Sequence, residues 1–141
     1  MSRFVSVRVG FLVAAALVGT CGAAPRRVVA RDWHVPAEAA TIQAAVDSAV
    51  AGDVVVLAAG TYSDCTELNG NGVAHIAILR NGIHLRGATG DPADVVLDAG
   101  RLGRCLELRS FADTTRIADV TFRRGKAVDP FGSGGAVFEY A

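Results

Sequence analysis

Apolar residues between positions 41 and 50 recur with the period of an α-helix. In this segment, TIQAAVDSAV, the apolar positions are 42, 45, 46, 49 and 50, which form one stripe along a helix. Thr41 can cap the N-terminus, and Gly52 is placed to end the helix. A helix this short is marginal by itself, so we expect its stripe to pack against another part of the chain.

From position 54 the pattern changes to short apolar runs that are separated by turn residues. Val54–Leu57 is a continuous apolar run, which is typical of a strand covered on both faces. Similar runs follow at 75–79, 83–87, 95–98, 105–108, 117–122 and 134–140. No helical period intervenes between them, which excludes a doubly wound α/β domain and indicates an all-β fold.

Two all-β architectures fit these strands. The Asn81-Gly82 pair lies between two apolar runs and is a strong hairpin signal, which favours an antiparallel sandwich or barrel. Against this, strand-like segments of similar composition recur at intervals of about one coil, as is expected for the stacked rungs of a β-solenoid. Periodicity alone leaves both architectures open.

The first residues have the layout of a secretory signal peptide. Arg3 and Arg8 precede the uncharged apolar stretch VGFLVAAALV, and small residues follow it. A membrane span needs about 20 apolar residues, and this stretch ends sooner. We therefore predict a cleaved signal peptide at 1–24, with an uncleaved anchor as the alternative.

The processing of this segment has several possible outcomes. Cleavage after Ala23, Ala24 or Ala30 fits the rule of small residues, and lipidation of Cys21 is an alternative to simple cleavage. We assign residues 25–33 to a linker. The protein is expected to be exported, and therefore secreted, periplasmic or at the cell surface, without a membrane span once the signal is removed.

Charge and composition narrow the classes of function. The 141 residues include 14 basic and 14 acidic side chains, so the formal net charge is zero. No basic stripe is present, so affinity for nucleic acid has no electrostatic source, and we exclude that partner. Aromatic residues make up only 6% of the chain and glycines number 16, which suits thin, tightly stacked strands.

Two cysteines, Cys65 and Cys105, remain after removal of the signal. Export permits a disulfide between them, and closing that loop would stabilise the fold by roughly 4 kcal/mol in the chain-entropy model. We favour this disulfide over two unpaired thiols packed as small apolar groups. His34, His75 and His84 are scattered and no Cys-x-x-Cys occurs, so no zinc site is predicted.

The segment 40–62, ATIQAAVDSAVAGDVVVLAAGTY, resembles the N-terminal cap of exported right-handed parallel β-helix proteins of the pectate-lyase-like superfamily. In that family a T-I-Q-x-A-[IV] helix covers the open end of the solenoid. A G-D-x-[VI]-x-[VL] strand then begins the first coil, which closes with G-x-Y. Segments 82–87, 116–122 and 132–135 are similar to the later coils of the family.

The resemblance covers residues 34–141 and implies one domain there. The implied fold class is all-β: a right-handed parallel β-helix (solenoid) with a short N-terminal capping α-helix. Because the chain stops at Ala141 inside an apparent strand, we expect the β-helix to be truncated at its C-terminus. A small, complete antiparallel β domain is the alternative.

Enzymes of the resembled superfamily degrade acidic polysaccharides with Arg or Lys bases and bound calcium, or with paired aspartates. In this chain the acids are spread singly over turns and strands, so neither a calcium site nor a carboxylate pair is predicted. These acids are Asp91, Asp94, Asp98, Asp113 and Asp119. We nominate no catalytic, cofactor-binding or metal-binding residue and expect no cofactor.

One local basic cluster, Arg123-Arg124-Gly125-Lys126, could contact an anionic sugar or surface polymer, or could be a solvated turn. The sequence therefore predicts an exported β-helix module, non-catalytic as it stands, whose partner is a polysaccharide or cell-surface polymer. The alternative is the N-terminal fragment of a polysaccharide lyase or glycoside hydrolase whose catalytic coils lie beyond residue 141.

Overall fold

The computed structural model describes residues 29–68, 73–109, 114–127 and 135–140, and for 138–140 it describes only the backbone. The predicted signal peptide at 1–24 lies outside the described residues, and so do Cys21 and Asp113. Among the described residues, no helix has the length and apolar character needed to cross a membrane.

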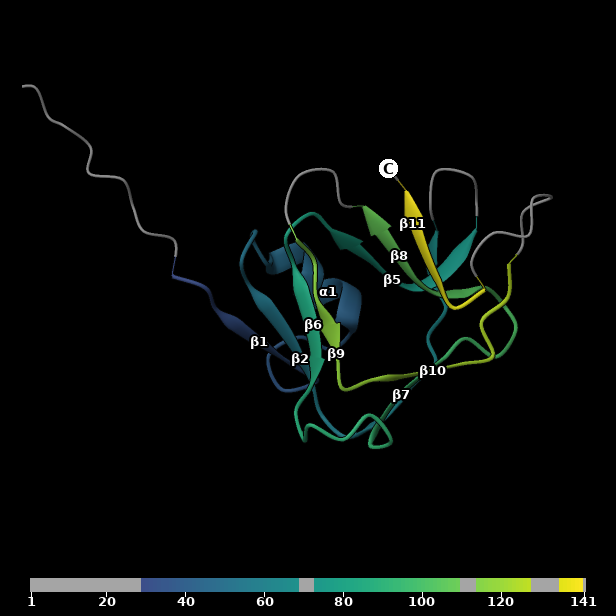
Figure 1. Ribbon diagram of the computed structural model, residues 1–141, viewed down its shortest axis with the longest axis horizontal. Helices are drawn as coiled ribbons and strands as arrows, with labels where there is room; N and C mark the ends of the chain where they lie inside the picture. The colour runs from purple at the N-terminus through teal and green to yellow at the C-terminus, as the bar shows by residue number, and fades with distance from the viewer. Residues whose placement is uncertain (1–28, 69–72, 110–113, 128–134, 141) are drawn as a thin grey trace, which may run out of the picture.

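Within the described ranges the strands form three small sheets (Figure 1). Sheet A is parallel in the order β1-β2-β6-β9, with β1 (Asp32–Val35), β2 (Val54–Leu57), β6 (His84–Gly87) and β9 (Ile117–Ala118). Sheet B is parallel in the order β10-β7-β3, with β3 (Gly60–Tyr62), β7 (Val95–Asp98) and β10 (Thr121–Arg123). Sheet C is mixed in the order β11-β8-β5-β4, with β4 (Glu67–Leu68), β5 (Ala74–Arg80), β8 (Arg104–Arg109) and β11 (Val137–Tyr140).

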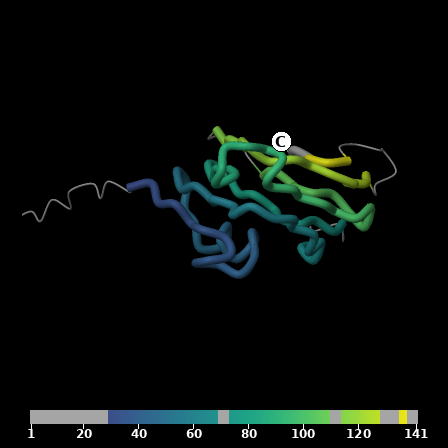
Figure 2. The backbone as a smooth tube through the Cα atoms, turned by 90° about the horizontal axis from the view of Figure 1, so that it is seen from below, coloured from purple at the N-terminus to yellow at the C-terminus, as the bar shows by residue number. Residues whose placement is uncertain are grey.

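Parallel neighbours in each sheet come from successive passes of the chain. In sheet A, Val55 lies between Trp33 and Leu85. In sheet B, Val96 likewise lies between Thr61 and Thr121. Figure 2 shows these passes lying beside one another in chain order, from the purple N-terminal end to the yellow-green C-terminal end.

The predicted fold class is wrong and is corrected here. The described residues form small sheets, two parallel and one mixed, together with one helix, rather than an all-β right-handed parallel β-helix that a helix caps. Strand β4 pairs antiparallel with β5, with Glu67 opposite His75. Strand β1 precedes the helix and begins at Asp32, inside the predicted linker.

The hairpin that the Asn81-Gly82 pair favours is not formed. The strands on either side of it, β5 and β6, lie in different sheets, so the pair does not close a hairpin. Gly82 has a positive φ of 73° and Ile83 N donates to the carbonyl of Arg80. The two residues therefore form a tight turn that redirects the chain from sheet C to sheet A.

The helix predicted from the apolar stripe is present as α1 (Ile42–Ser48). Thr41 caps it, since its Oγ1 accepts a hydrogen bond from Ala44 N at 3.1 Å. Ile42, Ala45 and Val46 are buried, and the helix contacts β1, β2 and β5. The expectation that the stripe packs against another part of the chain is confirmed.

Helix α1 also occupies the edge of β5. Gln43 Oε1 accepts a hydrogen bond from Ile78 N at 2.8 Å. This side chain therefore takes the place of the backbone carbonyl that a neighbouring strand would offer. Arg80 Nη2 donates to the Val46 carbonyl at 2.8 Å. An exposed strand edge can pair with another chain, and these contacts remove that opportunity along part of β5.

Asp53 joins β1 to the end of the helical segment. Its carboxylate is 3% exposed and accepts hydrogen bonds from Arg31 N, Trp33 Nε1 and Val50 N at 2.8, 3.1 and 3.0 Å. Burial acts to raise the pKa of this carboxyl, but the hydrogen bonds outweigh burial and hold the pKa below its ordinary value. Asp53 is therefore a buried anion that two backbone amides and the Trp33 indole satisfy.

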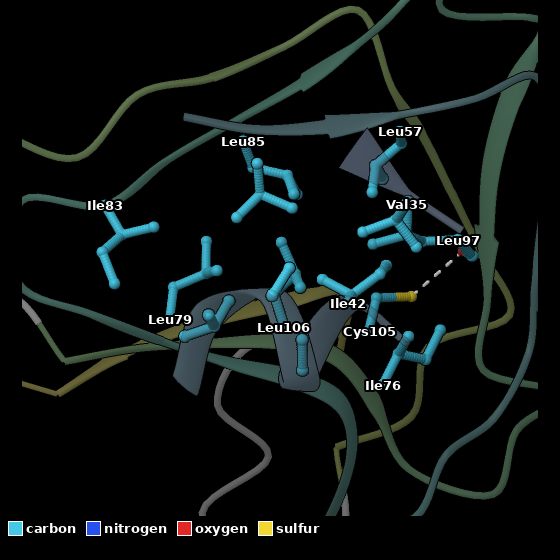
Figure 3. Packing of buried hydrophobic residues seen from close by; sticks show 14 of the residues in the cluster. Val35, Ile42, Leu57, Ile76, Leu79, Ile83, Leu85, Leu97, Cys105 and Leu106 are labelled. Carbon is cyan, nitrogen blue, oxygen red and sulfur yellow. Dashed lines mark hydrogen bonds between the residues drawn. The ribbon is translucent and has the colours of Figure 1, made fainter. Parts of the chain in front are cut away.

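Side chains from all three sheets and from α1 meet in one interior (Figure 3). Large apolar groups come from β2, β5, β6, β7 and β8, and Ile42 of α1 points toward them. Neighbouring passes approach closely at their turns. A β-carbon on Gly103 would collide with the Ala74 carbonyl, and one on Gly87 would collide with the Asp119 carbonyl.

The contribution of α1 can be measured with two identical substitutions. Val46 is fully buried and Val50 is 52% exposed. We expect Val46→Ala to lower the free energy of unfolding by about 2 kcal/mol, from lost burial and an unfilled cavity. Val50→Ala should change it by less than about 0.5 kcal/mol. Chemical denaturation measures both, and equal losses would contradict the placement of the helix.

Candidate functional site

The basic segment seen in the sequence converges on one buried carboxylate. Asp98 ends β7, and the strand register places Arg123 of β10 beside it. Arg123 Nε donates to Asp98 Oδ2 at 2.8 Å, while Arg124 Nε and Nη2 donate to Oδ1 and Oδ2, each at 2.7 Å. The Asp98 side chain is 1% exposed, whereas both arginine side chains are more than half exposed.

Two turns carry these side chains and are held together by backbone hydrogen bonds. Arg101 N donates to the Arg124 carbonyl, and Lys126 N donates to the Gly103 carbonyl, both at 2.7 Å. Arg101 and Arg124 have positive φ values of 65° and 52°. This left-handed backbone conformation is uncommon for residues other than glycine.

The turns bring four exposed cations together, and we call this set the basic cluster: Arg101, Arg123, Arg124 and Lys126. Asp98 contacts two of them, Arg123 and Arg124. The five side chains carry a formal charge of four minus one, or +3. The hydrogen bonds from Arg124, with those from Gly100 and Arg123, hold the pKa of Asp98 well below its ordinary value, and Asp98 raises the pKa of Arg124. Asp98 and Arg124 therefore form an ion pair at neutral pH.

This arrangement suits the binding of anions better than proton transfer. An arginine stays protonated at any physiological pH, so it is a poor general acid or base. Its planar fork of N–H groups matches the geometry of carboxylate, sulfate and phosphate. Asp98 restrains two of these forks while leaving them accessible to solvent.

A second polar group is buried on sheet C. His75 Nε2 lies 3.3 Å from Glu107 Oε2, and Arg109 Nε lies 2.8 Å from Glu107 Oε1. The His75 side chain is fully buried, and burial lowers its pKa although the charge of Glu107 opposes that shift. His75 is therefore neutral at neutral pH, and its burial leaves it out of reach of a ligand in solution.

The structure has Cys65 and Cys105 as free thiols, so it does not contain the predicted disulfide. Cys65 Sγ lies 3.7 Å from the Arg104 carbonyl oxygen. Cys105 Sγ is directed into the interior, 3.4 Å from the Leu97 carbonyl oxygen and 3.6 Å from that of Arg123. The two sulfurs thus contact different carbonyl groups, and burial raises the pKa of both thiols.

The other acidic residues and histidines that the sequence singles out lie in separate turns and strands. Asp91 accepts a hydrogen bond from Ala93 N in a turn, and Asp119 has a positive φ of 56° in another turn. His84 Nδ1 accepts a hydrogen bond from Arg116 N, while His34 lies on β1. Within the described ranges, no group of three or more His, Cys, Asp or Glu side chains could hold a metal ion.

Sequence reasoning missed the role of Asp98, which it treated as an isolated acid. The available signal was the recurrence of similar strands, because a parallel register of β7 and β10 places Asp98 beside Arg123. Comparison with protein families, with curated proteins and with solved structures finds no match for this chain. Function must therefore be argued from the geometry of these residues.

Replacing Asp98 tests whether the carboxylate holds the basic cluster together. Asp98→Asn removes the charge that both arginines contact, so we expect a lower melting temperature at pH 7. Because the pKa of Asp98 is lowered by folding, its contribution is complete above the ordinary value of 3.8 and is lost progressively as the pH falls below it. The difference from wild type should therefore shrink in acid.

The matched control for this measurement is Asp91→Asn. Asp91 is exposed and accepts a hydrogen bond from one backbone amide in its turn. Thermal unfolding from neutral to acidic pH should show a smaller change for this variant. A melting temperature for Asp98→Asn that equals wild type at pH 7 would contradict the assigned role.

The state of the cysteines can be read from alkylation without a reductant. In the native protein we expect Cys105, which is fully buried, to resist iodoacetamide, and Cys65, which is half-buried, to react slowly. After denaturation both should be labelled, as peptide mass spectrometry can establish. If both stayed unlabelled after denaturation, the thiols would be paired.

Proposed function

We propose that the protein is an exported binding module whose basic cluster contacts an anionic polymer, such as an acidic polysaccharide at a cell surface. The single observation that carries this proposal is that adjacent turns bring four exposed cations together, two of which, Arg123 and Arg124, are held by the buried carboxylate of Asp98. Export is inferred from the sequence of residues 1–24, which has the features of a secretory signal.

The geometry supports a polymer as the ligand for two reasons. Arg101 and Arg124 lie on adjacent turns, so a chain with repeated negative groups can contact both at once. Each contact on an exposed surface is weak, but several contacts to one chain act together and raise the overall affinity. A ligand with a single charge would gain little from this arrangement.

The expected dependence on salt follows from the exposure of these cations. Between about 0.1 M and about 1 M salt the screening length falls from about 10 Å to about 3 Å. Binding of the full-length protein to polygalacturonate should weaken strongly over this range. Binding to dextran, which is uncharged, should be weak at both salt concentrations.

Charge reversal within the basic cluster tests the location of the site. Lys126→Glu leaves the Asp98 contacts intact and should weaken binding to polygalacturonate by about tenfold, or about 1.4 kcal/mol. Arg116→Glu makes the same change of charge at an exposed position beside sheet A and is the control. Isothermal titration calorimetry measures both affinities. Equal effects of the two variants, or binding that is indifferent to salt, would overturn the proposal.

A further inference from the structure

A small hollow opens between the start of α1, strand β3 and the segment that contains β4. Its volume is about 140 Å³. An apolar cavity of about 150 Å³ holds one benzene molecule, and pockets for drug-sized ligands begin at about 300 Å³. The hollow therefore has room for a single small organic molecule.

The charged side chains described in the lining are both acidic. Asp64 and Glu67 both line the hollow, and among the described residues no lysine, arginine or histidine lines it. Neither carboxylate has a hydrogen bond or ion pair with any residue in the described part of the chain. By contrast, Asp32, Asp47 and Asp98 each contact an arginine.

The rest of the lining is mixed: Thr41, Gln43, Thr61, Ser63 and Thr66 are polar, and Ala40, Ile42, Tyr62 and Ile76 are apolar or aromatic. Ile42 and Ile76 are 2% and 5% exposed and belong to the buried apolar cluster. The hydroxyl of Tyr62 is already engaged, because it donates to the Ala58 carbonyl at 2.9 Å. The ring of Tyr62 is the part left for a ligand, and an aromatic ring attracts a cation over its face.

These features together define the chemistry of the occupant. A ligand must carry positive charge to match the two carboxylates and carbon atoms to contact the isoleucines. A divalent metal is a poorer match, because calcium contacts only oxygen ligands and would leave Ile42 and Ile76 in the lining without a partner. A primary ammonium group has three N–H donors, which two carboxylates and the hydroxyl of Thr66 can accept.

We propose that this hollow binds a small organic ammonium ion, with Asp64 and Glu67 accepting hydrogen bonds from its ammonium group and Tyr62, Ile42 and Ile76 contacting its carbon skeleton. The inference goes beyond the proposed function and does not depend on it, because none of these residues belongs to the basic cluster.

The test compares butylamine with butanol, which has a similar size but no charge. The probes are added to the full-length protein, and backbone amide shifts are followed by NMR. We expect butylamine to bind with a dissociation constant of about 1 mM and to shift the amides of Tyr62, Thr66 and Glu67. Butanol should bind at least about tenfold more weakly.

The variants Asp64→Asn and Glu67→Gln should each weaken butylamine binding by about tenfold, and Asp91→Asn, which lies outside the hollow, should leave it unchanged. The wild-type shift pattern locates the site even if a variant fails to fold. The proposal is overturned if butanol binds as tightly as butylamine or if the shifts lie elsewhere. It is also overturned if calcium chloride shifts the same amides while butylamine does not.

Discussion

The parallel backbone pairing between successive passes of the chain is the constraint on which the rest of the structure depends. Strand β2 lies between β1 and β6, β7 between β3 and β10, and β8 between β5 and β11. Because these strands have a partner on both edges, their buried amide and carbonyl groups remain hydrogen-bonded. Residues at matching positions then face the same side of a sheet, which gathers their apolar side chains into one interior.

Side chains complete the pairing where the sheets end. Gln43 bonds to the edge of β5 in place of a strand, and β4 pairs with the same edge from the antiparallel direction. Asp53 satisfies three amide and indole N–H groups where β1 meets the helical segment. In each case a polar group that would be costly to bury alone has a partner, so short sheets can close against a short helix.

The same stacking determines where charge accumulates. Adjacent turns place Arg101, Arg124 and Lys126 together, and Asp98 offsets part of their repulsion through its contact with Arg124. The hollow beside β4 has the opposite character, because Asp64 and Glu67 have no cation among its lining residues. Two surfaces of opposite charge thus arise in a chain whose formal net charge is zero, and net charge is a poor guide to the ligands of such a protein.

The sequence alone determined the local elements of this protein, and the tertiary structure decided which of them meet. The stripe of α1, its Thr41 cap and the apolar run of β2 follow from contacts within a few residues, so period and propensity locate them. The antiparallel return of β4, the pairing of β1 with β2 and the contact of Asp98 with Arg124 join residues farther apart. Such contacts depend on which strands become neighbours and on the direction of each turn. The alternation of apolar and polar residues restricts the register of a given pair of strands, but it does not specify which strands pair.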